Sequence, residues 1–200
     1  MSQPVDFYFE FASPYGYLAS RKIDEIGARY DRAVTWRPFL LGAVFKIVGT
    51  GPMFDYPLKS DYFLHDFPRS ARRMGIAATL PLGAPHNTIA AARAFYWLQE
   101  SDPAIAKTFA IRVYNRFFED GEDVSSPEAT AEIAAEVGAD REEALAAMQD
   151  QEIKDRLRAE NDAAIARGVF GSPFFFVGDE PFWGSDRLDQ VEDWLKSGGW

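Results

Sequence analysis

Hydrophobic and polar positions alternate near the start of the chain. In residues 5–11 Phe7, Phe9 and Phe11 lie on one face of an extended segment, while Tyr8 and Glu10 lie on the other. Residues 14–30 then carry apolar side chains mainly at helical spacing, and residues 34–39 alternate again. This order predicts a strand, a helix and a second strand. The two strands should be parallel, because a helical crossover joins them.

Helical periodicity dominates the middle of the chain, from about residue 43 to residue 166. Residues 90–99 are rich in alanine and aromatic side chains, as expected for a largely buried helix. Asp102 and Ser126, each followed by proline, and Asp140 mark helix starts, because short oxygen-bearing side chains cap helices and proline suits the first turn. We therefore expect a block made mainly of helices.

Short strands return after this helical block. Residues 174–177 and 181–183 flank a turn at Gly178 and predict an antiparallel hairpin. Residues 187–196 form a closing helical pattern that should stop at Gly198, where glycine accepts the left-handed conformation of a helix end. The element order is that of an α/β, thioredoxin-like fold (βαβ…ββα) with a large all-helical insertion. We assign residues 1–42 and 167–200 to the thioredoxin-like domain and residues 43–166 to the insertion.

Two serine–proline pairs stand at corresponding places in this predicted fold. Ser13 precedes Pro14 where the first strand gives way to a helix, so Ser13 should cap that helix. Ser172 precedes Pro173 at the start of the last hairpin, and we expect a cis peptide bond facing the first pair. A redox enzyme of this fold has cysteines at the first site, whereas this chain has none. Any sulfur chemistry must therefore use a thiol brought by a ligand.

Composition narrows the class of partner. The chain has 200 residues, 47% of them hydrophobic, and a formal net charge of −10, which opposes broad binding to nucleic acids or anionic membranes. No apolar stretch approaches the roughly 18 residues of a membrane span, and Asp6 and Glu10 interrupt the first apolar run. We expect a cytoplasmic protein with a small-molecule partner. With only two histidines, His65 and His86, we expect no metal site and assign neither a role.

Five groups of residues resemble one known family, the 2-hydroxychromene-2-carboxylate isomerases, which are related to kappa-class glutathione transferases and share their DsbA-like fold. The similar segments cover nearly the whole chain in the family's order: FEFASPYGYL (9–18), RPFLLGAVFK (37–46), KSDY (59–62) with Asp66 and Arg72, GVFGSPFFFV (168–177) and PFWGSDRL (181–188).

The resemblance implies glutathione as the cofactor and assigns residues to it. Ser13 would hold the glutathione thiolate by a hydrogen bond. The residues themselves agree, since a hydroxyl and the first N–H groups of a helix can stabilise an anion. Ser172, before the expected cis Pro173, would offer its backbone to the peptide. Ser185 and Asp186 match the positions that bind the γ-glutamyl end, where the carboxylate of Asp186 suits the ammonium and the helix start suits the carboxylate.

Two further positions concern the substrate and glutathione. Lys46 matches a lysine that would pair with a substrate carboxylate. Relatives commonly carry Gly-Asn shortly after this lysine, whereas this chain has Gly49 and Thr50. Thr50 has a hydroxyl but lacks the asparagine side-chain amide, which can donate and accept at the same time. Its expected contact with glutathione therefore departs from the family pattern.

The implied reaction interconverts 2-hydroxychromene-2-carboxylate and trans-o-hydroxybenzylidenepyruvate, a step in the catabolism of naphthalene-like aromatics. Reversible thiolate addition would turn a double bond of the aromatic 2-oxo acid into a rotatable single bond, without consuming glutathione. Aromatic residues make up 15% of the chain and suit a flat apolar pocket. Relatives are often dimers, so a homodimer is expected.

Two other functions stay open at this point. A kappa-like transferase would conjugate electrophiles with the same thiolate, and a non-catalytic thioredoxin-fold binding protein would have lost its chemistry with its cysteines. Each chosen residue also has an ordinary structural role: Ser13, Ser185 and Asp186 as helix-start residues, Lys46 as a surface lysine and Thr50 as a turn residue. Retention of Ser13 beside the second proline motif favours the enzymatic reading.

Overall fold

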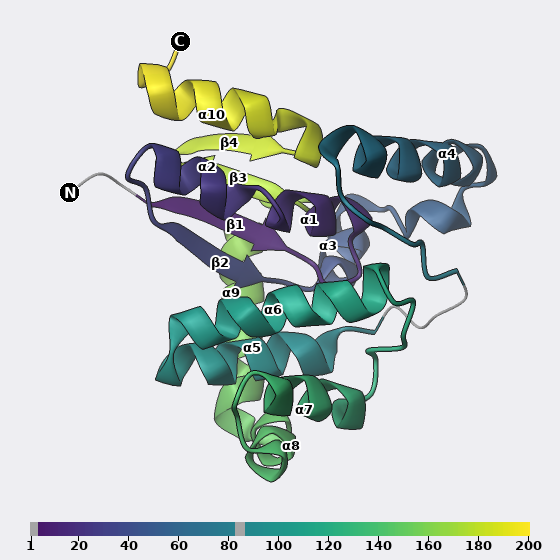
Figure 1. The fold of residues 1–200 in the computed structure, drawn as a ribbon, viewed down its shortest axis with the longest axis vertical. Coiled ribbons are helices and arrows are strands. Elements are labelled where there is room, and N and C mark those ends of the chain that lie inside the picture. Colours follow the sequence, from purple (N-terminus) through teal and green to yellow (C-terminus); the bar gives the residue numbers. More distant parts are fainter. Residues whose placement is uncertain (1–3, 83–86) are drawn as a thin grey trace.

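A four-stranded mixed sheet forms the centre of the molecule (Figure 1). The computed structural model describes residues 4–82 and 87–200. The strands are β1 (Val5–Phe9), β2 (Val34–Pro38), β3 (Phe174–Val177) and β4 (Glu180–Trp183), in the order β2-β1-β3-β4. Strand β1 is parallel to β2 and antiparallel to β3, and β3 and β4 form an antiparallel hairpin. The parallel pair and the hairpin confirm the sequence predictions.

Helices connect and cover these strands. They are α1 (Pro14–Ser20), α2 (Ile23–Arg29), α3 (Leu41–Val48), the 3₁₀ helix η1 (Met53–Asp55), α4 (Pro57–Met74), α5 (Ile89–Ser101), α6 (Pro103–Phe118), α7 (Pro127–Glu136), α8 (Arg141–Gln149), α9 (Gln151–Ala166), the 3₁₀ helix η2 (Ser185–Arg187) and α10 (Leu188–Ser197). Among the described residues no helix is both long and apolar enough to cross a membrane.

Both faces of the sheet are buried. On one face the rings of Phe7 and Phe9 meet Trp36 at 5.0 and 5.3 Å, and Phe9 also meets Phe95 of α5 and Tyr114 of α6, each at 5.8 Å. On the other face a smaller cluster contains Tyr8, Phe174 and Phe176, with side chains from α3 and α9. Each fully buried aromatic side chain contributes about 2–3 kcal/mol of hydrophobic stabilisation. These two layers hold the end of β1, where the candidate site begins.

The first predicted helix is two helices in the structure. Helix α1 ends at Ser20 and α2 begins at Ile23. The Ser20 hydroxyl donates to the carbonyl oxygen of Tyr17 at 2.7 Å, the carbonyl that would accept from residue 21 in a continuous helix. This local hydrogen bond explains why the chain turns here although the apolar spacing continues.

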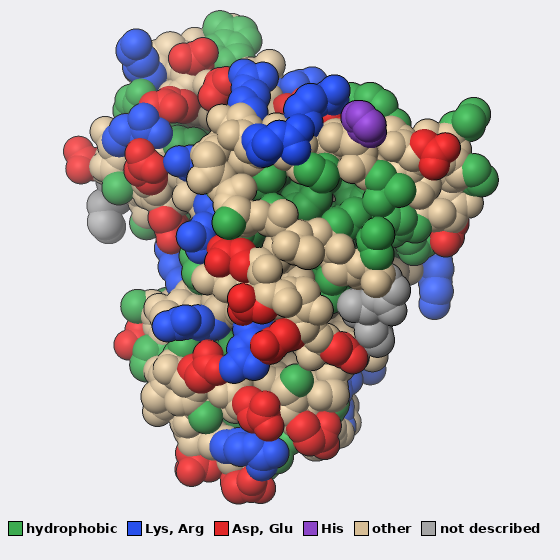
Figure 2. Space-filling model, turned by 45° about the vertical axis from the view of Figure 1, so that its right-hand side comes forward, with side chains coloured by type: hydrophobic (Ala, Val, Ile, Leu, Met, Phe, Trp, Pro, Cys, Tyr) green, Lys and Arg blue, Asp and Glu red, His purple; other side chains and the backbone are tan. Residues whose placement is uncertain are grey.

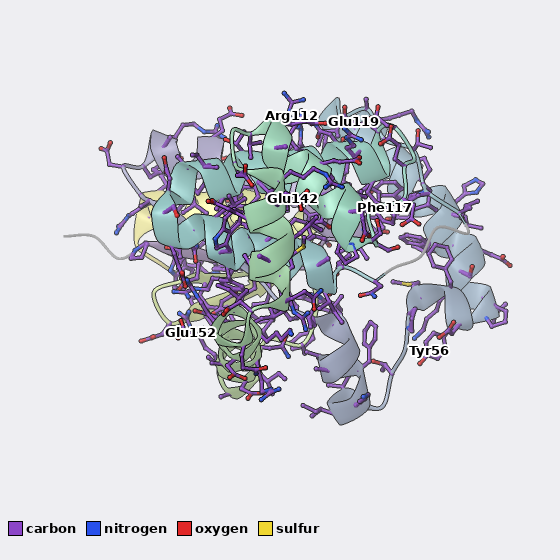
Figure 3. All side chains as sticks on the ribbon, turned by 90° about the horizontal axis from the view of Figure 1, so that it is seen from below. Tyr56, Arg112, Phe117, Glu119, Glu142 and Glu152 are labelled. Carbon is purple, nitrogen blue, oxygen red and sulfur yellow. The ribbon has the colours of Figure 1, made fainter. Side chains whose placement is uncertain are left out.

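Helices α3 and α4, with η1 between them, form a separate arm beside the sheet (Figures 1 and 3). We call residues 41–74 the arm. Seen from below, Tyr56 lies at its outer edge, away from Glu142 and Glu152 on α8 and α9. The Tyr56 hydroxyl accepts a hydrogen bond from the Gly51 N–H at 2.9 Å, which closes the turn between α3 and α4. The arm contacts the rest of the molecule through α4, which packs on α1, and through α3, which joins the smaller cluster on the sheet.

Candidate functional site

Ser13 occupies the N-cap of α1, as the sequence predicts. Its Oγ accepts from the Gly16 N–H at 3.0 Å and donates to the carbonyl oxygen of Ser172 at 3.0 Å. Pro14 has no N–H, and Gly16 already bonds Ser13, so the Tyr15 N–H is the remaining donor of this first turn. Since α1 has only seven residues, direct hydrogen bonds from Ser13 and Tyr15 would stabilise an anion here more than a long helix dipole would.

The second serine–proline pair lies directly against the first. The Ser172–Pro173 peptide bond is cis, as expected. Ser172 accepts two hydrogen bonds. Its carbonyl oxygen accepts from the Ser13 hydroxyl, and its Oγ accepts from the Glu10 N–H at 2.9 Å. The Tyr114 hydroxyl donates to the Glu10 carbonyl oxygen at 3.0 Å. Residues 159 positions apart in the chain therefore meet at one point above the end of β1.

Glu10 is the functional-site residue that sequence reasoning missed. Its carboxylate is buried, with the residue 7% exposed, and accepts from the Leu41 N–H at 3.0 Å and from the Thr88 hydroxyl. Burial raises the pKa of the Glu10 carboxyl, although hydrogen bonds from Thr88 and from backbone N–H groups of Leu41 and Ala12 oppose the rise. This carboxylate joins β1 to the starts of α3 and α5. The only sequence signal was a glutamate three residues before Ser13.

Gly16 leaves no room for a side chain beside the serines. A Cβ at residue 16 would lie 2.8 Å from the Tyr114 hydroxyl oxygen and 3.0 Å from the Ser172 Oγ. We expect Gly16→Ala to displace one of these groups, destabilise the fold by about 1–3 kcal/mol and reduce activity. Urea unfolding and steady-state rates measure the two effects.

A matched glycine provides the control for that prediction. Gly42 lies in α3, and a Cβ there would meet nothing within 4 Å. Gly42→Ala should leave activity unchanged and stabilise the fold by about 0.4–1 kcal/mol, since alanine restricts the unfolded chain more than glycine does. Equal effects of the two substitutions would contradict a packing role for Gly16.

Tyr15, two residues after Ser13, ties α1 to the arm. Its hydroxyl donates to Asp66 of α4 at 2.6 Å, and its ring packs on Phe63 and Phe67 at 5.9 and 6.3 Å. Asp66 also accepts from Tyr62 at 3.1 Å and pairs with Arg69. Burial opposes ionisation of Asp66, but the hydrogen bonds from Tyr15, Arg69 and Tyr62 outweigh it and lower its pKa. Asp66, which sequence analysis quoted only for its resemblance, thus positions the arm.

A double-mutant cycle measures this link. We expect Tyr15→Phe and Asp66→Asn each to destabilise the fold, with a coupling free energy of about 1 kcal/mol, since hydrogen bonds to charged groups are strong but this one is partly solvated. Because the folded-state pKa of Asp66 is lowered, the coupling is present at neutral pH and disappears as pH falls through that folded-state value. A coupling that persists in strong acid, measured by urea unfolding, would refute the charged hydrogen bond.

Lys46, expected at the substrate, and Thr50, expected at glutathione, lie on the exposed surface of the arm. Lys46 is in the last turn of α3 and Thr50 follows Gly49, the left-handed residue that ends α3. Neither side chain is hydrogen-bonded to the described residues around Ser13, so their roles stay predictions. The arm and the segment after it carry most of the exposed large hydrophobic side chains found in the described part of the chain: Ile47, Val48, Met53, Leu58, Tyr62, Leu64, Leu82 and Ile89. Figure 2 shows hydrophobic side chains gathered on this side of the molecule.

Ser185 and Asp186 lie in η2, one short turn before α10. They line a cleft of about 390 Å³ between α2, the end of α4 and the start of α10. Asp186 is exposed and pairs with Arg187 at 2.8 Å. Helix α1 contacts η2, so this cleft and Ser13 adjoin the same helix. Ser13, Ser172 and Pro173 are thus brought together, Ser185 and Asp186 lie beside them, and Lys46 and Thr50 lie on the arm.

His65 does not enter this arrangement. His65 is exposed on α4, and His86 lies outside the described residues. Within residues 4–82 and 87–200 no group of three or more potential metal-ligating side chains is found.

Comparison with known proteins identifies the family. The model of the DSBA-like thioredoxin domain matches residues 4–196. A 2-hydroxychromene-2-carboxylate isomerase from Pseudomonas putida is 31% identical over 190 residues, covering 94% of this chain and 92% of that protein. The chain belongs to this isomerase family. The solved structure of a 2-hydroxychromene-2-carboxylate isomerase shares the fold with a TM-score of 0.88 at 30% identity, covering 97% of this chain and 95% of that one.

A second group of relatives is also similar over nearly the full length. Glutathione S-transferase kappa 2 from Caenorhabditis elegans is 28% identical over 204 residues, covering 96% of this chain and 90% of that protein. These matches confirm the resemblance and the thioredoxin-like fold expected from the sequence. They identify the chain as an enzyme of the 2-hydroxychromene-2-carboxylate isomerase type.

Proposed function

We propose that this family member is a glutathione-dependent cis–trans isomerase that interconverts 2-hydroxychromene-2-carboxylate and trans-o-hydroxybenzylidenepyruvate. The observation that carries the proposal is the hydrogen bond between Ser13 and the carbonyl of Ser172, before a cis proline, in a chain without cysteine. This is the position of thiol chemistry in the fold, yet the chain offers only a hydroxyl and backbone groups there. A thiol from a ligand completes the set.

The donor and acceptor pattern suits glutathione. In the structure the Ser13 O–H donates to the Ser172 carbonyl, so the hydroxyl and the carbonyl are hydrogen-bonded to each other when no ligand is bound. A cysteinyl residue of a bound peptide offers one acceptor, its thiolate, and one donor, its backbone N–H. The thiolate can accept from Ser13 while the N–H donates to Ser172, so no polar group is left unpaired by the exchange. The Tyr15 N–H can supply a second hydrogen bond to the sulfur.

When bound, glutathione would supply a nucleophilic thiolate that adds reversibly to the conjugated system of the substrate. Ser13 would keep that sulfur ionised, because a donated hydrogen bond favours the charged form of a thiol whose ordinary pKa is about 8.5. Ser13 is held in place by hydrogen bonds that link it to Ser172, Ser172 to Glu10, and Glu10 to Tyr114. The apolar surface of the arm would exclude water and pack on the aromatic ring, and Lys46 would pair with the substrate carboxylate.

A kappa-like transferase is the second candidate, supported by the kappa-class relative in Caenorhabditis elegans. It would use Ser13 and Ser172 in the same way but release a stable thioether with the electrophile. Glutathione is consumed in that reaction and not in the isomerisation. The two functions therefore differ in stoichiometry rather than in the residues that hold the thiol.

The test is an ultraviolet assay of 2-hydroxychromene-2-carboxylate with purified protein, with and without reduced glutathione, and with thiol titration at the end. A spectral change that requires glutathione but leaves its concentration unchanged supports isomerisation. Loss of thiol in proportion to product supports the transferase. Absence of any glutathione-dependent change with either an isomerase substrate or a general electrophile rejects both. We further propose a cytoplasmic location, where glutathione is kept reduced, and a homodimer, which light scattering would detect.

A further inference from the structure

The main chain and the side chain of Glu10 contact two different parts of the molecule. Its N–H donates to the Ser172 Oγ at 2.9 Å, and its carbonyl oxygen accepts from the Ser13 N–H at 2.9 Å and from the Tyr114 hydroxyl at 3.0 Å. Its carboxylate instead accepts from the N–H of Leu41, the first residue of α3, at 3.0 Å. In Figure 1, α3 begins beside the end of β1. The proposed function uses the main-chain contacts and leaves the carboxylate unassigned.

Helix α3 is capped by side chains from other elements. It has eight residues, and the first N–H groups of any helix lack partners within that helix. Its N-cap is Leu40, whose side chain has no polar atom that could accept from them. The Glu10 carboxylate accepts from the Leu41 N–H, and the side chain of Asn161 on α9 accepts from the Leu40 N–H at 2.6 Å. These two hydrogen bonds fix the start of α3 against β1 and α9.

Apolar packing fixes the first half of α3 better than the second half. Val44 is buried in the smaller cluster on the sheet, whereas Ile47 and Val48 are 65% and 48% exposed. The last turn therefore has little buried surface of its own to determine where it lies. Since the backbone hydrogen bonds of a helix keep it nearly straight, the contacts at the start of α3 determine the position of its end.

Lys46, the expected partner of the substrate carboxylate, lies in that last turn. Five residues separate it from Leu41, which is about 7.5 Å along the helix axis. The distance between Lys46 and a thiol at Ser13 therefore depends on the direction of α3. A displacement of about 1 Å between reacting groups can lower a rate about 100-fold. Glu10 is connected to both sides, because its main chain supports Ser13 and its side chain supports the helix that carries Lys46.

We propose that Glu10 is a positioning residue that aligns the substrate, held by Lys46, with the thiol held at Ser13. This inference rests on the proposed isomerase function and on the expected role of Lys46. The carboxylate acts through α3 and touches neither reactant. Its removal should impair the use of the substrate and leave glutathione binding intact, because the main-chain hydrogen bonds of Glu10 around Ser13 and Ser172 do not involve its side chain.

Steady-state kinetics and calorimetry of Glu10 variants test the assignment. Glu10→Met removes both carboxylate oxygens but keeps an unbranched side chain of similar length. We expect its KM for 2-hydroxychromene-2-carboxylate to rise at least about tenfold, while the calorimetric Kd for glutathione changes less than about twofold. The pKa of the bound thiol should stay unchanged. Glu10→Gln should keep KM within about threefold, because its amide oxygen can accept from Leu41 while its NH₂ faces Thr88, whose hydroxyl can also accept.

Lys46→Met tests whether Glu10 acts through α3. This variant should also raise the substrate KM, and the double variant Glu10→Met/Lys46→Met should be within about twofold of the poorer single variant, whereas independent effects would multiply. An unchanged KM in Lys46→Met would overturn the inference, since α3 would then carry no partner for the substrate carboxylate. Asn161→Ala removes the other hydrogen bond at the start of α3 and should raise KM in the same direction, which keeps the test decisive if Glu10→Met does not fold.

Ile133→Ala is the control for lost stability. Ile133 is a buried residue of α7, so its truncation destabilises the fold without altering the start of α3. It should leave both KM and the glutathione Kd unchanged, and circular dichroism checks that every variant is folded. If the unmodified enzyme isomerises its substrate with glutathione but folded Glu10→Met keeps the substrate KM, or loses glutathione binding equally, the positioning role is wrong and the proposed function stands. If the unmodified enzyme shows no glutathione-dependent isomerisation, both are wrong.

Discussion

Ser13→Ala is expected to lower kcat/KM for glutathione-dependent isomerisation by about 100-fold or more. Removal of one preorganised donor to a developing or resident anion typically has an effect of this size. The hydroxyl also caps α1, so we expect a loss of about 1 kcal/mol in the free energy of unfolding. Rates at saturating glutathione, together with the pH dependence of thiolate absorbance in the bound complex, measure the effect. The pKa of the bound thiol should rise in the variant.

Ser20→Ala is the control for this experiment. Ser20 is a buried serine of the same helix, and among the described residues its hydroxyl bonds only the Tyr17 carbonyl. We expect unchanged activity in this variant. A folded Ser13→Ala enzyme with unaltered kcat/KM would reduce Ser13 to a helix cap and remove the basis of the proposed mechanism.

Glu10→Leu should destabilise the fold by about 3 kcal/mol. The substitution leaves the Leu41 N–H and the Thr88 hydroxyl without their acceptor in a buried place, and each unsatisfied donor costs about 1–3 kcal/mol. Glu10→Gln should have a smaller effect, since an amide keeps one acceptor but turns its NH₂ toward a donor. Urea unfolding at constant pH gives both values. The matched surface change Glu152→Gln, on α9 (Figure 3), should stay within about 0.5 kcal/mol of the unmodified protein.

The contribution of Glu10 also depends on pH, in an unusual direction. Burial raises its folded-state pKa above the ordinary value of 4.5, so between these two values the folded state holds a proton that the unfolded state has released. Stability from this group is therefore greatest below pH 4.5 and falls as pH rises through the folded-state pKa. The stability difference between the unmodified protein and Glu10→Gln should shrink over that window. A difference that grows with pH would mean that the buried carboxylate is stabilised as an anion.

Glu10 shows where reasoning from the sequence stops. The alternation in residues 5–11 correctly predicts which side chains share a face of β1, but it carries no information on what covers that face. Thr88 and Leu41, which lie 78 and 31 positions away, bury the carboxylate. Tyr15 and Asp66 meet across 51 positions for the same reason. Periodicity reports the direction of a side chain, whereas burial depends on elements that pack there later in the chain.

The division into a thioredoxin-like domain and an insertion remains a prediction, as do the roles of Lys46 and Thr50. The fold itself, the resemblance to the isomerases and the cis Ser172–Pro173 bond are confirmed. Two smaller points were wrong, because β1 ends at Phe9 rather than at residue 11 and the first helix is interrupted after Ser20. Both errors concern element boundaries, and the break after Ser20 coincides with the hydrogen bond of its hydroxyl to the Tyr17 carbonyl.

Sequence alone determined the strand–helix order, the cap at Ser13, the lack of any cysteine and the family. These properties depend on interactions between residues a few positions apart, or on which residue types are present at all. Tertiary structure alone decided that Glu10 is buried, that Tyr15 holds the arm through Asp66, and that Lys22 and Arg73 share a cleft with no ion-pair partner among the described carboxylates. Burial and unpaired charge are set by distant segments that meet only when the chain is packed, because both depend on what surrounds a group rather than on its neighbours in sequence.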